Sequence, residues 1–412
     1  MIKGLSIFIL LFFYFVNTKF SFIPIYTYQF VFAITVIYFL VNKKYFYLEE
    51  KIKPFVMVYV VVFIYLLFNY SINGFEDNTL VKTWIVFLIK SFIGVYLLVL
   101  ILKVEKYSFN ELVLLLQIAI FIHATLMLIY FFNADFKEWT LEYIPQGGSN
   151  INHANTYRSR GIVSSSGATL ALFQSFGLLF TTFLLTIDKL NSKKVLYYGI
   201  SFIVILGSIV VSGRTGLLML PMIFLYIILL YIKDKESSKV LIKFFVILGF
   251  LLLLIGLGYY YNNIEKFSQG EISSLMNWFS REVIIKDGSI EILTLNILSK
   301  QWLFPSDLFS WILGDTSTWT VSRIKTDIGY LRTLNALGVV GSLIFYGFFI
   351  WIFKNAIKNL NDNRNKMMVL VLGIFLFITE YKEPFFGKVM ISSMITLLYF
   401  STILLKEKCE EK

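Results

Sequence analysis

The chain is a succession of apolar stretches separated by mostly short polar connections. A helix crosses the hydrocarbon core of a bilayer with about 20 apolar residues, and twelve stretches reach or approach that length. The pattern predicts an all-α, polytopic integral membrane protein with about 12 transmembrane helices, folded as a single membrane domain over residues 1–412. The predicted spans are 2–17, 23–41, 54–70, 84–102, 111–132, 167–187, 195–211, 215–232, 240–259, 331–353, 367–379 and 387–405.

Composition excludes a soluble globular protein. Hydrophobic residues make up 58% of the chain and charged residues 15%, and the mean hydropathy is +0.75. Soluble domains are about half apolar, and about a quarter of their residues are charged. The first apolar stretch follows Lys3 closely, but no small-x-small cleavage motif comes after it, so we expect an uncleaved first span rather than a signal peptide.

The lysines and arginines in the connections predict the orientation. With a cytoplasmic N-terminus, the inner segments contain 21 of these cations, whereas the outer connections without the longest one contain eight. The positive-inside rule therefore places both termini in the cytoplasm and two long loops, 133–166 and 260–330, outside. The net charge of +11 then belongs mostly to an inner face that meets anionic lipid, and no nucleic-acid partner is needed to explain it.

Metal and cofactor chemistry has little support in the sequence. The single cysteine, Cys409, lies in a charged tail, and the two histidines are His123, inside the fifth span, and His153, in the first long loop. A multi-histidine or cysteine metal cluster cannot be built from this set. We predict no metal and no cofactor, and for His123 we favour a neutral imidazole bonded to a neighbouring helix over a proton relay.

Arginine is distributed differently from lysine. The chain has 30 lysines and seven arginines, and six of the seven arginines fall on the predicted outer side, where cations should be scarce. A guanidinium can bind a phosphate with two parallel hydrogen bonds and stays charged near apolar surroundings. The set indicates a site for a lipid-linked phosphate or pyrophosphate, and the alternative is that these side chains extend to lipid headgroups. The six are Arg158, Arg160, Arg214, Arg281, Arg323 and Arg332.

Two arginine motifs lie at the mouths of predicted spans. The sequence from Val211 to Gly216 predicts a tight turn between the seventh and eighth spans, with Arg214 near the membrane surface. Arg158 and Arg160 end the first long loop, and small residues up to Gly167 follow them. Hydroxyls, backbone donors and a helix N-terminus favour anion binding there.

A third motif closes the large loop and opens the tenth span. It runs from Arg323 to Gly341 and places Asp327 among cations that include Arg332. Asp327 is a candidate general base, and the alternative is a helix cap that pairs with an arginine. The helix is expected to begin near Gly329 and to pack closely through one face, formed by Leu331, Leu334 and Gly338.

The large loop, 260–330, is predicted to be partly helical. From Gly288 to Phe304 apolar residues recur at helical spacing, and Pro305 ends the run, which predicts an amphipathic helix lying on the membrane as a lid. For the tryptophans of the loop, interfacial anchoring is favoured over sugar stacking. The spaced apolar residues are Ile292, Leu295, Leu298 and Trp302, and the tryptophans are Trp278, Trp302, Trp311 and Trp319.

This layout resembles that of the bacterial O-antigen and capsule repeat-unit polymerases (Wzy type) and the related O-antigen ligases. The local matches are Arg158 to Gly161, Ser212 to Gly216, Arg281 followed by Trp311 to Asp315, and Asp327 to Gly341. The ligases typically have a histidine four residues before the leucine that corresponds to Leu331. Asp327 occupies that position here, which favours a polymerase and leaves the identity of the base open.

The resemblance implies a membrane glycosyltransferase that joins undecaprenyl-pyrophosphate-linked oligosaccharide repeat units on the outer face of the bacterial inner membrane. The transfer would be inverting and metal-independent, and a chain-length regulator protein is an implied partner beside membrane lipid. Asp327 would position or deprotonate the acceptor hydroxyl, and Arg214 would stabilise the leaving group. The pyrophosphate would be bound by Arg214 with Arg158 or Arg160, and by Arg281, Arg323 and Arg332.

Two other functions stay open. A ligase would share the chemistry but transfer the glycan to a lipid A core or another acceptor. A lipid-linked oligosaccharide flippase or transporter would be expected to place charges near the membrane midplane. Lys90 and His123 are the main intramembrane candidates, and we expect Lys90 to lie close enough to the outer end of its span to extend to the surface.

Overall fold

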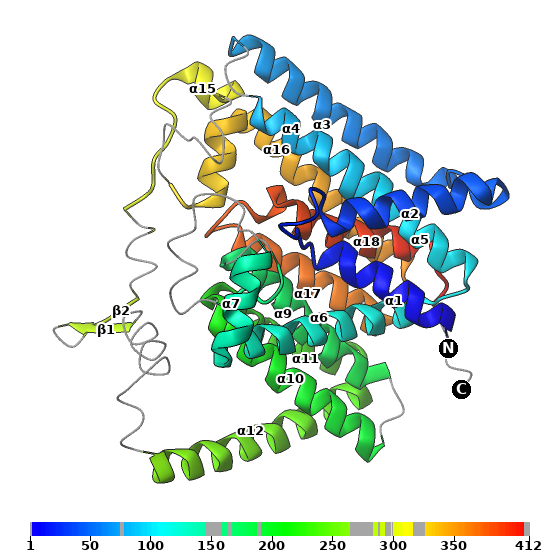
Figure 1. Cartoon of the computed structure of the whole chain (residues 1–412). Coiled ribbons are helices and arrows are strands. Elements are labelled where there is room, and N and C mark those ends of the chain that lie inside the picture. Colours follow the sequence, from blue (N-terminus) through cyan, green and yellow to red (C-terminus); the bar gives the residue numbers. More distant parts are fainter. Residues whose placement is uncertain are drawn as a thin grey trace. The chain divides into compact units, whose positions relative to one another are not determined.

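The computed structural model describes most of the chain, and these residues are almost entirely helical (Figure 1). Each of the twelve apolar stretches falls on a helix. Among the described residues, seven helical stretches are long and apolar enough to cross a membrane, which supports a helical membrane protein, and the total of about 12 spans stays a prediction. The described residues are 2–74, 78–144, 159–163, 167–187, 191–263, 283–286, 289–292, 298, 300–315 and 326–407.

The chain divides into two compact units, whereas the sequence offered no boundary inside the predicted single domain. Unit 1 comprises residues 1–18, 23–116 and 301–412, and unit 2 comprises 19–22 and 117–300. The helices of unit 1 are α1 (Ile2–Phe15), α2 (Thr27–Val41), α3 (Lys53–Ile72), α4 (Thr79–Val86), the π-helix η3 (Phe87–Gly94), α5 (Val95–Val104), α15 (Leu308–Leu313), α16 (Gly329–Asn359), α17 (Asn363–Thr379) and α18 (Val389–Leu404), with short 3-10 turns η1 (Lys43–Tyr45), η2 (Glu50–Ile52) and η6 (Phe385–Gly387). The helices of unit 2 are α7 (Ala134–Tyr143), α9 (Ala168–Ile187), α10 (Ser192–Ser212), the 3-10 helix η4 (Arg214–Leu218), α11 (Met219–Lys233) and α12 (Lys235–Asn263), and α6 (Phe109–Phe132) begins in unit 1 and continues into unit 2.

Aromatic side chains form much of the core of unit 1. The Tyr59 and Trp84 rings stack at 5.1 Å, Trp84 and Phe87 stack at 4.9 Å, and Phe348 of α16 meets both Trp84 and Phe87 edge-on. Such rings bury a large apolar area with few rotatable bonds. These ring contacts hold α4 and η3 against α16, and α3 and α16 lie side by side (Figure 1).

The π-helix η3 lies inside the continuous helical stretch Thr79–Val104 and buries two consecutive polar residues. Ser91 meets Ser393 of α18 at 2.9 Å between the hydroxyl oxygens. Lys90 is only 4% exposed and lies against α2. The expectation that Lys90 reaches the surface is therefore wrong: the π-helical turn directs it into the protein, 11 residues from the start of this stretch.

Helix α16 begins at Gly329, as predicted, but it is broken at Gly338, where φ is 64° and ψ is −176°. Thr333 and Tyr346 are 13 residues apart, which is about 20 Å along a straight helix. The Tyr346 hydroxyl nevertheless lies 3.0 Å from Thr333 Oγ1, because the segment before Gly338 folds back on the one after it. The predicted packing face through Leu331, Leu334 and Gly338 is thus interrupted at its last member, since Gly338 is not helical.

The break in α16 is filled by the short helix α15 and by Gly314 after it. A Cβ on Gly314 would lie 2.5 Å from Gly338 N, and a Cβ on Gly338 would overlap the Ile312 carbonyl. The Leu337 carbonyl, which the break frees, accepts from Tyr65 Oη of α3 at 2.6 Å, and the Leu313 carbonyl at the end of α15 accepts from Asn69 Nδ2. Two motifs far apart in the sequence, 311–315 and 327–341, therefore meet backbone to backbone.

Unit 2 is built around α9, in which almost every residue is buried and which contacts α10, α11, α12 and η4. His123 Nδ1 of α6 accepts from Gln174 Nε2 of α9 at 2.6 Å, and Ser208 Oγ of α10 donates to Gln174 Oε1 at 3.4 Å. This is the helix-to-helix hydrogen bond that the sequence favoured for His123.

The predicted surface helix from Gly288 to Phe304 is wrong at Ser289–Ile292 and at Trp302–Phe304, whereas Leu298 is helical. Val283–Lys286 (β1) and Ser289–Ile292 (β2) form an antiparallel pair (Figure 1), and Trp302 to Phe304 are not helical. The alternation of β-branched residues around Asp287-Gly288 is a strong hairpin signal in the sequence, and it outweighs the helical spacing of four apolar residues.

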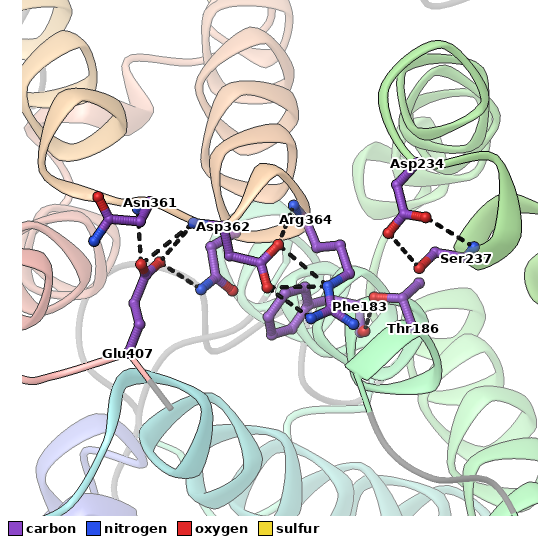
Figure 2. A network of polar contacts seen from close by, with 9 residues as sticks. Phe183, Thr186, Asp234, Ser237, Asn361, Asp362, Arg364 and Glu407 are labelled. Carbon is purple, nitrogen blue, oxygen red and sulfur yellow. Dashed lines mark hydrogen bonds and ion pairs between the residues drawn. The ribbon is translucent and has the colours of Figure 1, made fainter. Parts of the chain in front are cut away.

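The ends of several helices are closed by polar contacts that follow from short sequence motifs (Figure 2). In unit 1, Glu407 accepts from Asn361 N and from Asn365 Nδ2, both at 2.7 Å, and thereby attaches the last described residues to the start of α17. Arg364, the one arginine predicted to be inside, pairs with Asp362 at 2.7 Å. In unit 2, Ser237 Oγ donates to Asp234 at 2.7 Å ahead of α12.

We predict that Gly338→Ala strongly destabilises the protein. An alanine at this positive φ is strained, and its Cβ would overlap the backbone of α15, so the loss should be about 3 kcal/mol or more. The apparent melting temperature of detergent-solubilised protein measures it. The control is Gly347→Ala in the same helix, where a Cβ meets nothing within 4 Å and the change should be under about 0.5 kcal/mol. Equal melting temperatures for the two variants would show that the close contact does not stabilise the fold.

Candidate functional site

The start of α16 holds an ion pair between Asp327 and Arg332. Arg332 Nη2 lies 3.0 Å from Asp327 Oδ1, and the side chains are 20% and 60% exposed respectively. Arg332 Nε donates to the Thr326 carbonyl, and Asp327 N donates to Gln301 Oε1 at 2.7 Å. Asp327 therefore pairs with an arginine, as one alternative foresaw, but it is not the cap, since the N-cap is Ile328, whose apolar side chain forms no capping hydrogen bond.

A second carboxylate, Glu380, lies buried next to the same helix start. It follows the end of α17 and is 0% exposed. Glu380 Oε1 accepts from Tyr346 Oη at 3.0 Å, and Oε2 accepts from Phe386 N at 3.2 Å. Burial raises the pKa of this carboxyl to about 8, although the two hydrogen bonds and Lys388 act in the opposite direction.

Close backbone contact joins Glu380 to the first turn of α16. A Cβ on Gly329 would overlap the Glu380 carbonyl, so only glycine permits this approach. Tyr330 Oη donates to Phe377 O at 2.5 Å, and the Tyr330 and Tyr346 rings are 5.2 Å apart. Asp327 and Glu380 thus belong to one polar cluster at the beginning of α16, which we call the α16 cluster: Thr326, Asp327, Tyr330, Arg332, Thr333, Tyr346 and Glu380.

An apolar groove of about 600 Å³ runs between α16 and α17 and ends at the α16 cluster. Tyr330 of the cluster and Lys354, which follows the break in α16, both line it. The wall between them is almost wholly apolar, so the groove suits a hydrocarbon chain whose polar head lies at Tyr330. The other lining residues are Ile350, Phe353, Ile357, Leu370, Gly373, Ile374, Phe377 and Ile378.

In unit 2, Arg214 stands at the predicted tight turn, which is confirmed. Helix α10 ends at Ser212, Gly213 is the single connecting residue, and Arg214 begins η4. A Cβ on Gly216 would lie 2.5 Å from the Ala171 carbonyl, so the turn packs closely on α9. Arg214 itself is half-buried.

The segment of the first long loop that precedes α9 lies beside this turn. Ser159 N donates to Val211 O at 2.8 Å, and Ser159 Oγ donates to Met127 O at 2.6 Å. Gly161 has a positive φ of 57° and packs on His123 and Met127. Two sequence motifs with candidate arginines are therefore neighbours within unit 2.

Arg160 occupies a structural position. It is 2% exposed, and its Nη2 donates to the carbonyls of Thr140 and Ile144 at 2.9 Å each, which closes the C-terminal end of α7. Burial lowers the pKa of the guanidinium, and the neighbouring Tyr130 hydroxyl opposes this shift. Arg214 is the more exposed of the two described arginines of unit 2.

Several predicted residues lie outside the described residues. They include three candidate arginines, the small residues ahead of α9, one histidine, the cysteine and two tryptophans of the large loop: Arg158, Arg281, Arg323, Ser164, Ser165, Ser166, His153, Cys409, Trp278 and Trp319. Of the other loop tryptophans, Trp311 stacks on Phe304 at 5.5 Å, and Trp302 is 49% exposed in an apolar surface with Leu308 and Phe309. That surface agrees with interfacial anchoring.

Glu380 is the residue that sequence reasoning missed. It stands in Thr379-Glu380-Tyr381-Lys382-Glu383, a short connection that reads as ordinary polar surface. The one available signal is an acidic residue directly at the end of an apolar span, where a charge is costly unless it has a role. Among the residues that the structure describes, no three His, Cys, Asp or Glu side chains gather in a group suited to a metal ion.

Comparison with known proteins finds neither a protein-family model nor a curated protein that matches this chain. The functional argument therefore rests on the residues and their geometry.

The stability of the protein should fall as the pH rises through about 8, because of Glu380. Its pKa is raised on folding, so the neutral acid stabilises the fold fully below about pH 4.5, and this contribution is lost as the carboxyl ionises. Between pH 5 and pH 9 the loss should be about 2 to 4 kcal/mol. Glu380→Gln should remove this part of the pH dependence, and the control Glu50→Gln, at an exposed position in unit 1, should keep it. Parallel melting curves for Glu380→Gln and wild type across this range would contradict the assignment.

Proposed function

We propose that the protein is a membrane glycosyltransferase that polymerises lipid-linked oligosaccharide repeat units at the outer face of the bacterial inner membrane. The observation that supports it best is the α16 cluster, where an arginine-oriented carboxylate and a buried acid stand at the end of an apolar groove. A substrate with a long isoprenoid chain and a pyrophosphate-linked glycan has the matching division into an apolar part and a charged part. The lysine distribution predicts that this end of α16 is outside.

The proposed reaction is the displacement of undecaprenyl pyrophosphate by a sugar hydroxyl. The acceptor oxygen forms a bond to the anomeric carbon, and the bond from that carbon to the pyrophosphate oxygen breaks, with its electron pair leaving on the pyrophosphate. The hydroxyl proton passes to the Asp327 carboxylate, which Arg332 holds in place. Inversion at the anomeric carbon follows from a single displacement.

Arg214 of unit 2 is assigned to the leaving group on the resemblance alone, independently of the geometry of the α16 cluster in unit 1. Its guanidinium can form two parallel hydrogen bonds to a pyrophosphate and stabilise the charge that develops there, an effect commonly worth about 3 kcal/mol for one well-placed donor. Gly216 lets the turn that presents Arg214 pack closely on α9. Arg158, Arg281 and Arg323 remain further candidates by the resemblance alone, and Arg160 is the weakest candidate because it closes α7.

Glu380 acts in this proposal as a positioning residue. It touches Tyr346, which bonds Thr333, and Thr333 is the neighbour of Arg332 in the first turns of α16. A change at Glu380 should therefore alter the orientation of Arg332 and Asp327 rather than remove a group that contacts the sugar. Membrane lipid and a chain-length regulator protein are the proposed partners.

A transporter of lipid-linked oligosaccharide is the second candidate, and one observation favours it. Lys90 is buried near the middle of a 26-residue apolar stretch, as a charge in a transport pathway would be. Substrate-coupled ion flux in proteoliposomes would support this function. Polymer formation from purified repeat units by the same preparation would support the polymerase instead.

We predict that Asp327→Asn and Arg214→Ala each lower the yield of polymer by about 100-fold or more, because one removes the base and the other a donor to the leaving group. The measurement is the ladder of glycan lengths in a strain that lacks the chromosomal copy and expresses the variant at wild-type level. Loss of a polymerase leaves a single repeat unit on its acceptor, whereas loss of a ligase leaves none.

The control is Glu236→Gln, which removes an exposed carboxylate paired with Lys239 at 2.8 Å and should leave the ladder unchanged. Arg214→Lys should retain a small part of the activity, since a lysine supplies charge without the two parallel bonds. Full-length polymer from correctly inserted Arg214→Ala would refute the role in pyrophosphate binding.

A further inference from the structure

Lys90 is the most unusual charged residue among those the structure describes. It is 4% exposed, and its Nζ lies 4.3 Å from the centre of the Tyr28 ring and 5.9 Å from the centre of the Tyr14 ring. No described side chain forms an ion pair or a hydrogen bond with this Nζ. An ammonium taken out of water without a counterion is costly, and two aromatic faces replace only part of the lost hydration.

The backbone holds Lys90 in this position. The Tyr14 hydroxyl donates to the Lys90 carbonyl, and Gly94 makes room for the Tyr14 ring, since a Cβ there would overlap the hydroxyl. The π-helix turns Lys90 toward α2 while Ser91 keeps its bond to α18. Irregular π-helical turns are frequent at functional sites, and this one presents a cation that a regular helix would place elsewhere.

A cavity of about 380 Å³ opens at Lys90. Its lining combines Lys90 and polar groups from the first turn of α2 with apolar side chains of α2, α4 and η3. Tyr28 and Gln29 belong to that first turn, since α2 begins at Thr27. The N-terminus of a helix carries a partial positive charge, so the dipole of α2 adds to the field of the ammonium. The lining residues are Tyr28, Gln29, Phe32, Val86, Ile89 and Lys90.

We propose that this cavity binds the phosphoryl group of a membrane lipid, with Lys90 as its counterion. The site has a buried, unpaired cation, a helix N-terminus and an apolar wall in one small space. A phosphate supplies the missing negative charge, and the apolar side chains Phe32, Val86 and Ile89 suit the first part of a lipid tail. The phosphoryl group could come from a glycerophospholipid, from a polyprenyl phosphate or from free phosphate.

This site is independent of the proposed glycosyl transfer, because it uses none of the residues assigned to that reaction and lies elsewhere in unit 1. Both candidate functions involve phosphate-bearing lipids, so the inference holds under either.

The test is lipid binding to the purified full-length protein in detergent, measured by native mass spectrometry. Phosphatidylglycerol, undecaprenyl phosphate, uncharged undecaprenol and inorganic phosphate are titrated separately against wild type, Lys90→Met and Lys90→Arg. The probe that binds wild type at the lowest concentration identifies the source of the phosphoryl group. We expect Lys90→Met to weaken binding of that probe by about 10-fold or more and Lys90→Arg to weaken it less, because arginine keeps the charge.

The matched control is Lys82→Met, which removes an exposed lysine from the same helical stretch and should leave binding unchanged. A second measurement needs no variant: an amine-directed reagent is applied to wild type, and labelling of Lys90 is compared with labelling of Lys82 by peptide mass spectrometry. The lipid that binds should protect Lys90 and not Lys82.

The inference is overturned if no phosphate-bearing probe protects Lys90 from labelling. It is also overturned if wild type binds undecaprenol as tightly as undecaprenyl phosphate and phosphatidylglycerol, because the phosphoryl group would then contribute nothing. A failure of either kind leaves the glycan ladder of the polymerase experiment unaffected, so the two proposals fail separately.

Discussion

The arrangement of unit 1 depends on a contact between two glycine backbones. Gly314 and Gly338 approach so closely that neither has room for a Cβ, and both have a positive φ. This contact fits α15 into the break of α16 and turns the first segment of that helix back on the second. Thr333 consequently reaches Tyr346, and Tyr346 reaches Glu380. A straight helix would separate Thr333 and Tyr346 by about 20 Å, and the α16 cluster would not exist.

Such a cluster stores unfavourable free energy that the surrounding structure must offset. A buried carboxyl loses its hydration, and the Tyr346 hydroxyl and the Phe386 amide replace part of it at Glu380. A glycine outside the usual helical region and a helix without its regular hydrogen bonds at the break add to this cost. The stacked aromatic core around Trp84 and Phe348 lies directly beside the break and offers the apolar burial that balances it. Strain concentrated in one place, in an otherwise regular helical unit, is typical of a functional site.

The sequence predicts the helices well and their irregularities poorly. Apolar runs of about 20 residues have one stable form in a membrane, so each of the twelve stretches was placed on a helix without knowledge of its neighbours. The break at Gly338 depends on a partner segment more than 20 residues earlier in the chain, and nothing in the helix itself specifies it. Glu380 was missed for the same reason, because its burial comes from the fold of α16 and not from its own surroundings in the sequence. The β1–β2 pair was different: its Asp287-Gly288 signal was present and was overlooked in favour of a weaker helical spacing.

The structure shows what the chain uses arginine for and what it uses lysine for at particular positions. Arg160 uses its guanidinium to close a helix, and Arg332 uses it to orient a carboxylate, so a residue kept for its geometry serves two different purposes in one protein. Lysine, used almost everywhere as a solvated charge, has one exception in Lys90. Its ammonium lies over the Tyr28 ring beside the cavity, where a compact charge on a flexible stem is held between aromatic faces. Residue type thus follows the shape required at each position. The outer arginines depart from the general use of lysine as the cation, and Lys90 departs from the general exposure of the lysines. These two departures mark the places where a charged ligand is expected.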